Sequence, residues 1–119
     1  MKKVMLLLAV ALCSVSGSFA QDKKVRVTGN VTDYETAEPV GMATVQLLAL
    51  PDSSFKLGAT TDEKGRFELD DRLQLGNYLV KVSFVGYGDE HRTFTVADDT
   101  RRVRFDSIRL KTDALLLKE

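Results

Sequence analysis

The sequence contains few of the residues that build metal centres, covalent cross-links and catalytic sites. Among 119 residues there are one cysteine, Cys13, one histidine, His91, and no tryptophan. A lone cysteine excludes an intramolecular disulfide, and a zinc site needs several Cys or His ligands. A nucleophilic triad needs a base oriented by a third group, and a single histidine does not provide that pattern. We therefore expect no enzyme activity, no metal and no cofactor, with His91 in an exposed loop.

The signatures of calcium and phosphate sites are missing too. Asp62, Asp70 and Asp71 supply carboxylates, but the dense aspartate-rich loop typical of calcium binding does not occur. No glycine-rich phosphate loop is present. We interpret these aspartates as turn residues. The triplet at residues 30–32 matches a glycosylation sequon, but it lies inside an expected strand and is assigned no role.

Neither sign of charge dominates, since 17 basic residues balance 17 acidic ones. A near-neutral surface predicts no electrostatic attraction to nucleic acid. The one basic cluster in the sequence consists of Arg101, Arg102 and Arg104. Its alternation with Val103 and Phe105 predicts the solvent-exposed side of a strand.

The longest apolar run, residues 4–15, is too short for a membrane span, which needs about 20 residues. Lysines precede this run, and the small residues Ser18 and Ala20 follow it. This layout predicts a secretory signal peptide over residues 1–20, cleaved between Ala20 and Gln21, and hence export. Lipidation of Cys13 is the alternative, which the bulky Leu12 before it disfavours.

Apolar and polar residues alternate through most of the remaining chain, as is typical of half-buried strands. The expected strands cover about residues 25–32, 43–50, 55–61, 67–69, 76–84, 92–96 and 103–110. Turns rich in Gly, Pro and Asp separate them. Seven short strands within this length predict an all-β fold, a seven-stranded antiparallel β-sandwich of the Ig-like kind.

The pattern also predicts finer features of this sandwich. The strand at 43–50 is apolar on both faces and should be central. The turn at residues 62–65 should close a tight hairpin, and the polar residues 70–72 should end the following strand. A β-bulge is expected near Asp106 and Ser107, because the apolar spacing shifts there. The expected buried side chains are Phe67, Tyr78, Val80, Val82 and Phe84.

Four sequence blocks resemble, in their order and distances, the carboxypeptidase regulatory-like domain. They are Val27-Thr28-Gly29-Asn30-Val31-Thr32-Asp33, Glu38-Pro39-Val40-Gly41-Met42-Ala43-Thr44-Val45, Thr60-Thr61-Asp62-Glu63-Lys64-Gly65-Arg66-Phe67 and residues 76–87. The resemblance implies a transthyretin-like, starch-binding-like sandwich over residues 25–111, after a polar leader at 21–24. Related hydrolases carry several active-site histidines, which this sequence lacks.

Domains similar to this one follow the signal peptide of Bacteroidetes TonB-dependent outer-membrane receptors. Residues 112–119 resemble an extended lead-in to the plug domain of such receptors, and Leu115, Leu116 and Leu117 are the expected partner contacts. The resemblance thus implies a periplasmic module working with receptor or transport machinery in nutrient uptake. The chain is then a receptor fragment, a truncated product or a separate module.

Two alternatives stay open. One is a free-standing periplasmic domain that binds carbohydrate or protein, with Tyr34 or Tyr87 stacking on a sugar. The other is an appendage of a secreted peptidase.

Overall fold

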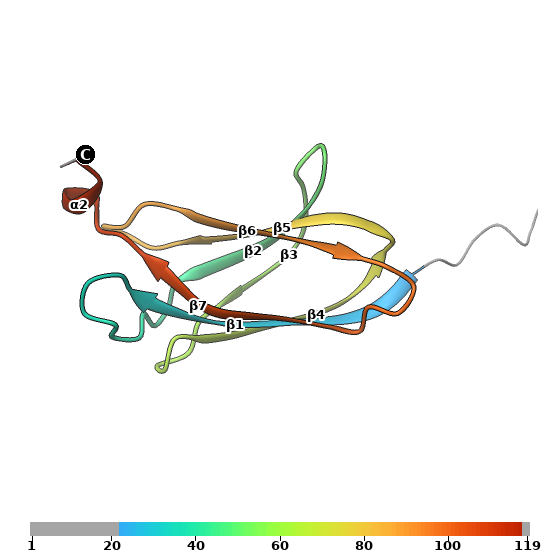
Figure 1. Ribbon diagram of the computed structural model, residues 1–119, viewed down its shortest axis with the longest axis horizontal. Helices are drawn as coiled ribbons and strands as arrows, with labels where there is room; N and C mark the ends of the chain where they lie inside the picture. The colour runs from blue at the N-terminus through green and yellow to red at the C-terminus, as the bar shows by residue number, and fades with distance from the viewer. Residues whose placement is uncertain (1–21, 118–119) are drawn as a thin grey trace, which may run out of the picture.

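The computed structural model describes residues 22–117 of the chain. Two sheets pack face to face as a sandwich, one with the strand order β4-β1-β7 and the other with the order β3-β2-β5-β6 (Figure 1). The strands are β1 (Asp22–Asp33), β2 (Thr44–Ala49), β3 (Ser54–Thr60), β4 (Arg66–Gln74), β5 (Gly76–Ser83), β6 (Glu90–Val96) and β7 (Arg102–Leu110). A short helix, α2 (Asp113–Leu117), follows. The predicted all-β sandwich of seven strands is confirmed. In this part of the chain no helix is long and apolar enough to cross a membrane.

The core lies between the sheets and is built from the inward positions of alternating strands. Phe67, Tyr78, Val80 and Val82 are buried as predicted, whereas Phe84 is only partly buried and packs beside Tyr87. The other fully buried apolar side chains include Val25, Val27, Val31, Val45, Leu47, Leu69, Leu73, Val96, Ile108 and Leu110. Strand β2 lies between β3 and β5, which confirms its predicted central place.

One strand pair departs from the expected antiparallel arrangement. Strands β1 and β7 run parallel, while every other pair is antiparallel. The reason is that the turn after β6 carries the chain to the opposite sheet, at the end where β1 begins (Figure 1). The predicted bulge is confirmed, because Thr28 faces Arg104 whereas Asn30 faces Ser107.

The expected hairpin at residues 62–65 is wrong. The turn exists, with Gly65 at φ 77° and its N–H donating to the Asp62 carbonyl. However, β3 pairs with β2 and β4 pairs with β1, so the turn joins two sheets. Strand β4 also continues through residues 70–72, because Leu69 and Leu73 keep the inward alternation while Asp70 pairs with Arg26.

Candidate interaction surfaces

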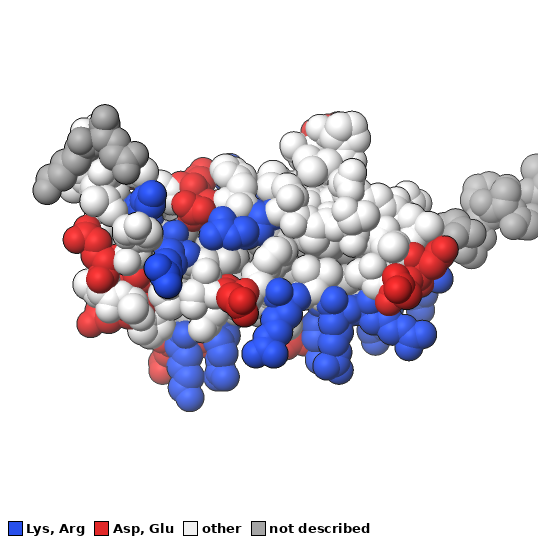
Figure 2. Space-filling view, viewed as in Figure 1, with Lys and Arg blue, Asp and Glu red and all other residues white. Residues whose placement is uncertain are grey.

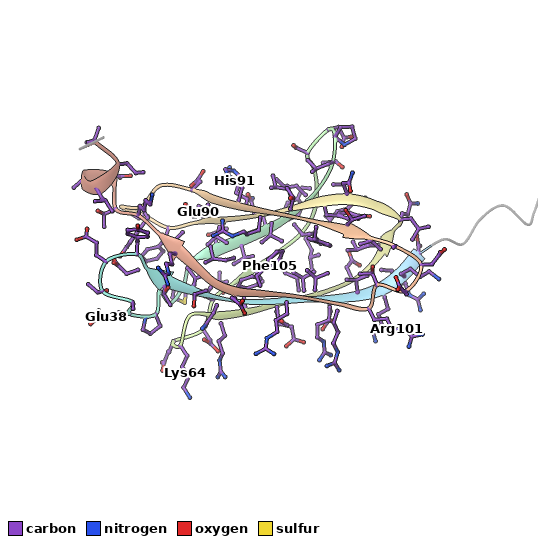
Figure 3. All side chains as sticks on the ribbon, in the orientation of Figure 1. Glu38, Lys64, Glu90, His91, Arg101 and Phe105 are labelled. Carbon is purple, nitrogen blue, oxygen red and sulfur yellow. The ribbon has the colours of Figure 1, made fainter. Side chains whose placement is uncertain are left out.

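The titratable residues singled out from the sequence do not converge. His91 lies on strand β6, not in a loop, opposite Lys81, and its side chain is exposed as expected (Figure 3). Across residues 22–117 no group of three or more His, Cys, Asp or Glu side chains could hold a metal ion. The predicted cleavage site at Ala20 and Gln21 lies outside the described residues.

Asp62 organises the turn between the sheets. Its Oδ1 accepts hydrogen bonds from the N–H groups of Lys64 and Arg66, each at 2.9 Å. The bond from the Arg66 N–H is the largest cause that lowers the pKa of this carboxyl, because it stabilises the charged form. This geometry supports the interpretation of Asp62 as a turn residue. Asp70 instead lies on the outer face of β4, beside Arg26.

A second aspartate, Asp33, joins distant segments at the C-terminal end of β1. The Tyr87 hydroxyl donates to Asp33 Oδ2 at 2.7 Å, while Asp33 Oδ1 accepts from the N–H groups of Glu35 and Thr36. The Tyr87 bond is the main cause that lowers the pKa of Asp33 and raises that of Tyr87. Tyr87 is therefore engaged in the structure, and the Lys111 ammonium covers one face of Tyr34 at 4.9 Å. Tyr34 is nevertheless 47% exposed, so it is the more open of the two tyrosines for stacking on a sugar.

The C-terminal segment is not extended, so this expectation is wrong for residues 113–117. These residues form α2, which is bound to the loop after β5. The Asp113 N–H donates to the Gly86 carbonyl, and the Gly88 N–H donates to the Lys111 carbonyl. Leu116 occupies the space where Gly88 lacks a side chain. Of the three expected contact residues, Leu115 is half-buried, Leu116 is partly covered and Leu117 is 86% exposed.

Basic side chains gather on the outer face of the β4-β1-β7 sheet, which we call the basic face (Figure 2). The strand register and the alternating burial place seven of them there. They are Lys24 and Arg26 on β1, Arg66 and Arg72 on β4, and Arg102, Arg104 and Arg109 on β7. Five acidic residues, Asp22, Asp62, Glu68, Asp70 and Asp106, lie on or beside this face.

A hollow of about 610 Å³ opens around the bulge of this sheet. Arg66 and Arg104 line it together with Asp62, Glu68 and Asp106. Asn30 also lines the hollow, and its buried Oδ1 has no hydrogen-bond partner among the described residues. The lining is polar and mixed in charge, so the hollow does not suit an apolar ligand.

The outer face of the other sheet is different in character. Its outward positions carry mainly neutral residues, with Lys81 on the central strand β5 and His91 on the edge strand β6 as ionisable exceptions. Phe55 is 60% exposed there and its ring lies over Gly58. The sandwich thus has one basic and one largely neutral face.

Sequence reasoning identified only part of the basic face. It placed Arg102 and Arg104 on the solvent side of a strand, and both are exposed. It missed the other members because they lie on strands that become neighbours only in the fold. The sequence signal that could have revealed the basic face is the occurrence of arginine or lysine at outward positions of three separate strands.

The fold and these surfaces define a small β-sandwich domain with one basic and one largely neutral face. The chain belongs to the carboxypeptidase regulatory-like domain family, whose model matches residues 26–110. This confirms the resemblance drawn from the four sequence blocks. The sequence has no significant match among curated proteins.

Solved structures with similar folds come from unrelated functional contexts. The group B streptococcus pilus 2b backbone protein is 14% identical, with a TM-score of 0.56 over 80% of this chain and 43% of that one. The catechol 1,2-dioxygenase of Acinetobacter sp. ADP1 is 12% identical, with a TM-score of 0.61 over 81% of this chain and 55% of that one. The 5-hydroxyisourate hydrolase of Klebsiella pneumoniae is 15% identical, with a TM-score of 0.57 over 71% of this chain and 90% of that one.

At these identities the likeness shows the fold alone. The chain spans less than half the length of the pilus protein and just over half the length of the dioxygenase. Two of these neighbours are enzymes, so the fold by itself does not distinguish a catalytic from a non-catalytic protein.

Proposed function

We propose that this chain is an exported, non-catalytic accessory module that serves as the N-terminal periplasmic domain of a TonB-dependent outer-membrane receptor for nutrient uptake. The family supports a regulatory-like module, and the scattered titratable residues support a role without chemistry. The receptor context comes from the resemblance of the sequence blocks and of residues 112–119.

The observation that carries this proposal is the attachment of the C-terminal segment. Strand β1 begins at one end of the sandwich and α2 lies at the other (Figure 1). The hydrogen bonds from the Asp113 N–H to Gly86 and from the Gly88 N–H to Lys111 fix the direction of the chain as it leaves β7. This arrangement suits an N-terminal domain that is followed by a further segment at the end where α2 lies.

A free-standing periplasmic binding domain is the second candidate. The exposed ring of Phe55 on the largely neutral face favours it, because aromatic side chains anchor protein partners and stack on sugars. This function would place the partner over β2, β3 and β5 instead of at α2.

Affinity capture from cells that produce the protein tests the proposal. A tag inserted in the exposed turn at residues 51–53 leaves α2 and the basic face unchanged. We expect an outer-membrane receptor polypeptide to co-purify from solubilised envelopes, and the purified chain to leave 5-hydroxyisourate and catechol unchanged. Recovery with soluble glycans or soluble proteins alone would favour the free-standing domain, and turnover of either compound would overturn the non-catalytic role.

A further inference from the structure

The basic face keeps like charges side by side. In the strand register Lys24 lies opposite Arg72, and Arg26 lies opposite Arg102. Like charges directly opposite on neighbouring strands destabilise a sheet. An anionic partner that covers this face would relieve the repulsion.

Most of these arginines lack an acidic partner. Arg26 lies 3.2 Å from carboxylate oxygens of both Glu68 and Asp70, and Arg66 lies 3.5 Å from Asp62. In the described part of the chain, no ion pair involves the other members of the face, Lys24, Arg72, Arg102, Arg104 and Arg109. The face therefore presents guanidinium groups whose donors are available to phosphate oxygens.

The chemistry of the face limits the partner that could occupy it. Its neutral outward positions on β1 and β7 carry small polar residues, Thr28, Asn30, Thr32 and Ser107. Protein interfaces are usually anchored by buried aromatic or aliphatic groups, and single-stranded nucleic acids stack on aromatic rings. The outward positions of these three strands provide neither.

The basic groups of this face form a two-dimensional array. Outward residues repeat at roughly 6.6 Å along each strand, and neighbouring strands lie about 4.8 Å apart. Basic groups occur on all three strands and not along a single line or groove. Such an array suits a partner whose negative charges also lie in a plane.

We propose that the outer face of the β4-β1-β7 sheet docks onto the phosphate headgroups of an anionic lipid bilayer. The strands then lie along the membrane surface, and the largely neutral sheet faces away from it. Attraction is electrostatic, because the outward positions of this face offer no apolar side chain for insertion. This inference does not depend on the identity of any receptor.

Vesicle co-sedimentation of the full chain tests the proposal. Vesicles of phosphatidylcholine alone are compared with an equal mixture of phosphatidylcholine and phosphatidylglycerol. The test variant is Arg102→Gln with Arg104→Gln, and the matched control is Lys56→Gln with Lys81→Gln, which removes the same charge from the opposite sheet. Every protein carries the same N-terminal segment, so the comparison isolates the sheet.

We expect the wild type to bind the mixed vesicles, and the arginine variant to bind about thirty-fold more weakly, since each basic residue at an anionic surface contributes roughly fivefold. The lysine variant should weaken binding by less than about threefold. Binding should fall when salt rises from about 0.1 M to about 1 M, which shortens the Debye length from ~10 to ~3 Å. Equal effects of the two variants would overturn the proposal, as would binding to a short DNA duplex in preference to vesicles. Unchanged thermal melting of both variants would show that folding is not the cause.

Discussion

Phe67 fills a space that the neighbouring strand leaves open. A Cβ at Gly29 would lie 2.5 Å from the Phe67 ring, so the glycine on β1 makes room for the aromatic side chain on β4. The ring is 4% exposed and belongs to the core. Phe84, by contrast, is only partly buried at the edge of the core, and its ring packs against that of Tyr87.

Truncation of these aromatics should therefore differ in cost. Phe67→Ala should lower the free energy of unfolding by about 3 to 5 kcal/mol, and Phe84→Ala by about 2 kcal/mol, because less of its surface is buried. Phe55→Ala, at an exposed position, is the control and should cost less than about 0.5 kcal/mol. Urea unfolding measures all three, and a larger loss for Phe84 than for Phe67 would show that this description of the core is wrong.

The hydrogen bond between Tyr87 and Asp33 couples stability to pH. It lowers the pKa of Asp33 in the folded protein below the ordinary value of 3.8, so the unfolded chain binds the proton more readily. The resulting stabilisation is present above about pH 4 and is lost as the pH falls through the folded pKa.

Tyr87→Phe should raise the pKa of Asp33 towards its ordinary value and reduce this acid-sensitive stabilisation. An NMR titration of the Asp33 carboxyl measures the effect directly. Tyr34→Phe is the matched control, because the Tyr34 ring contacts Lys111 and no hydrogen bond of its hydroxyl is found within residues 22–117. An unchanged Asp33 titration in Tyr87→Phe would mean that the backbone bonds from Glu35 and Thr36 alone set its pKa.

At the scale of elements, alternation predicted the strands well and their pairing poorly. Period-two patterns depend on residues that are close in sequence, and the apolar positions of β5 are buried as expected. Asp62 and Gly65 specify a reversal of the chain, but they do not specify whether the next strand stays in the same sheet. That choice depends on β1, which offers both its edges to β4 and β7.

The C-terminal helix shows another limit of sequence reasoning. Three adjacent leucines indicated an exposed tail, because nothing in their neighbourhood predicts a partner surface. In the structure Gly88, about 28 positions earlier, leaves the space that Leu116 fills. Such complementarity between distant segments appears only when the loop after β5 is positioned.

Deletion of residues 113–119 should consequently destabilise the domain. It removes the bond from the Asp113 N–H to Gly86 and the packing of Leu116, so we expect a loss of about 1 to 3 kcal/mol in urea unfolding. Leu117→Ser, at a position 86% exposed, is the control and should be nearly neutral. A deletion without effect would mean that α2 does not stay bound to the loop in solution.

On the scale of the whole molecule, balanced composition conceals an uneven surface. The 17 basic and 17 acidic residues of the sequence predicted no electrostatic attraction to nucleic acid, yet seven basic side chains share one face of one sheet. The sandwich separates the outward positions of its two sheets, and these positions differ in charge. The total charge therefore does not predict where charge gathers on a small sandwich, whereas the strand register does.

The central claim is that this module works by contact at the end where α2 lies. A photo-reactive amino acid replacing the exposed Leu117 tests it most directly, with the same substitution at Asp98, in the turn after β6 at the opposite end, as the control. In living cells we predict a covalent adduct between position 117 and an outer-membrane receptor, and little or none from position 98. Equal labelling from both positions, or adducts of position 117 with soluble proteins alone, would contradict the account.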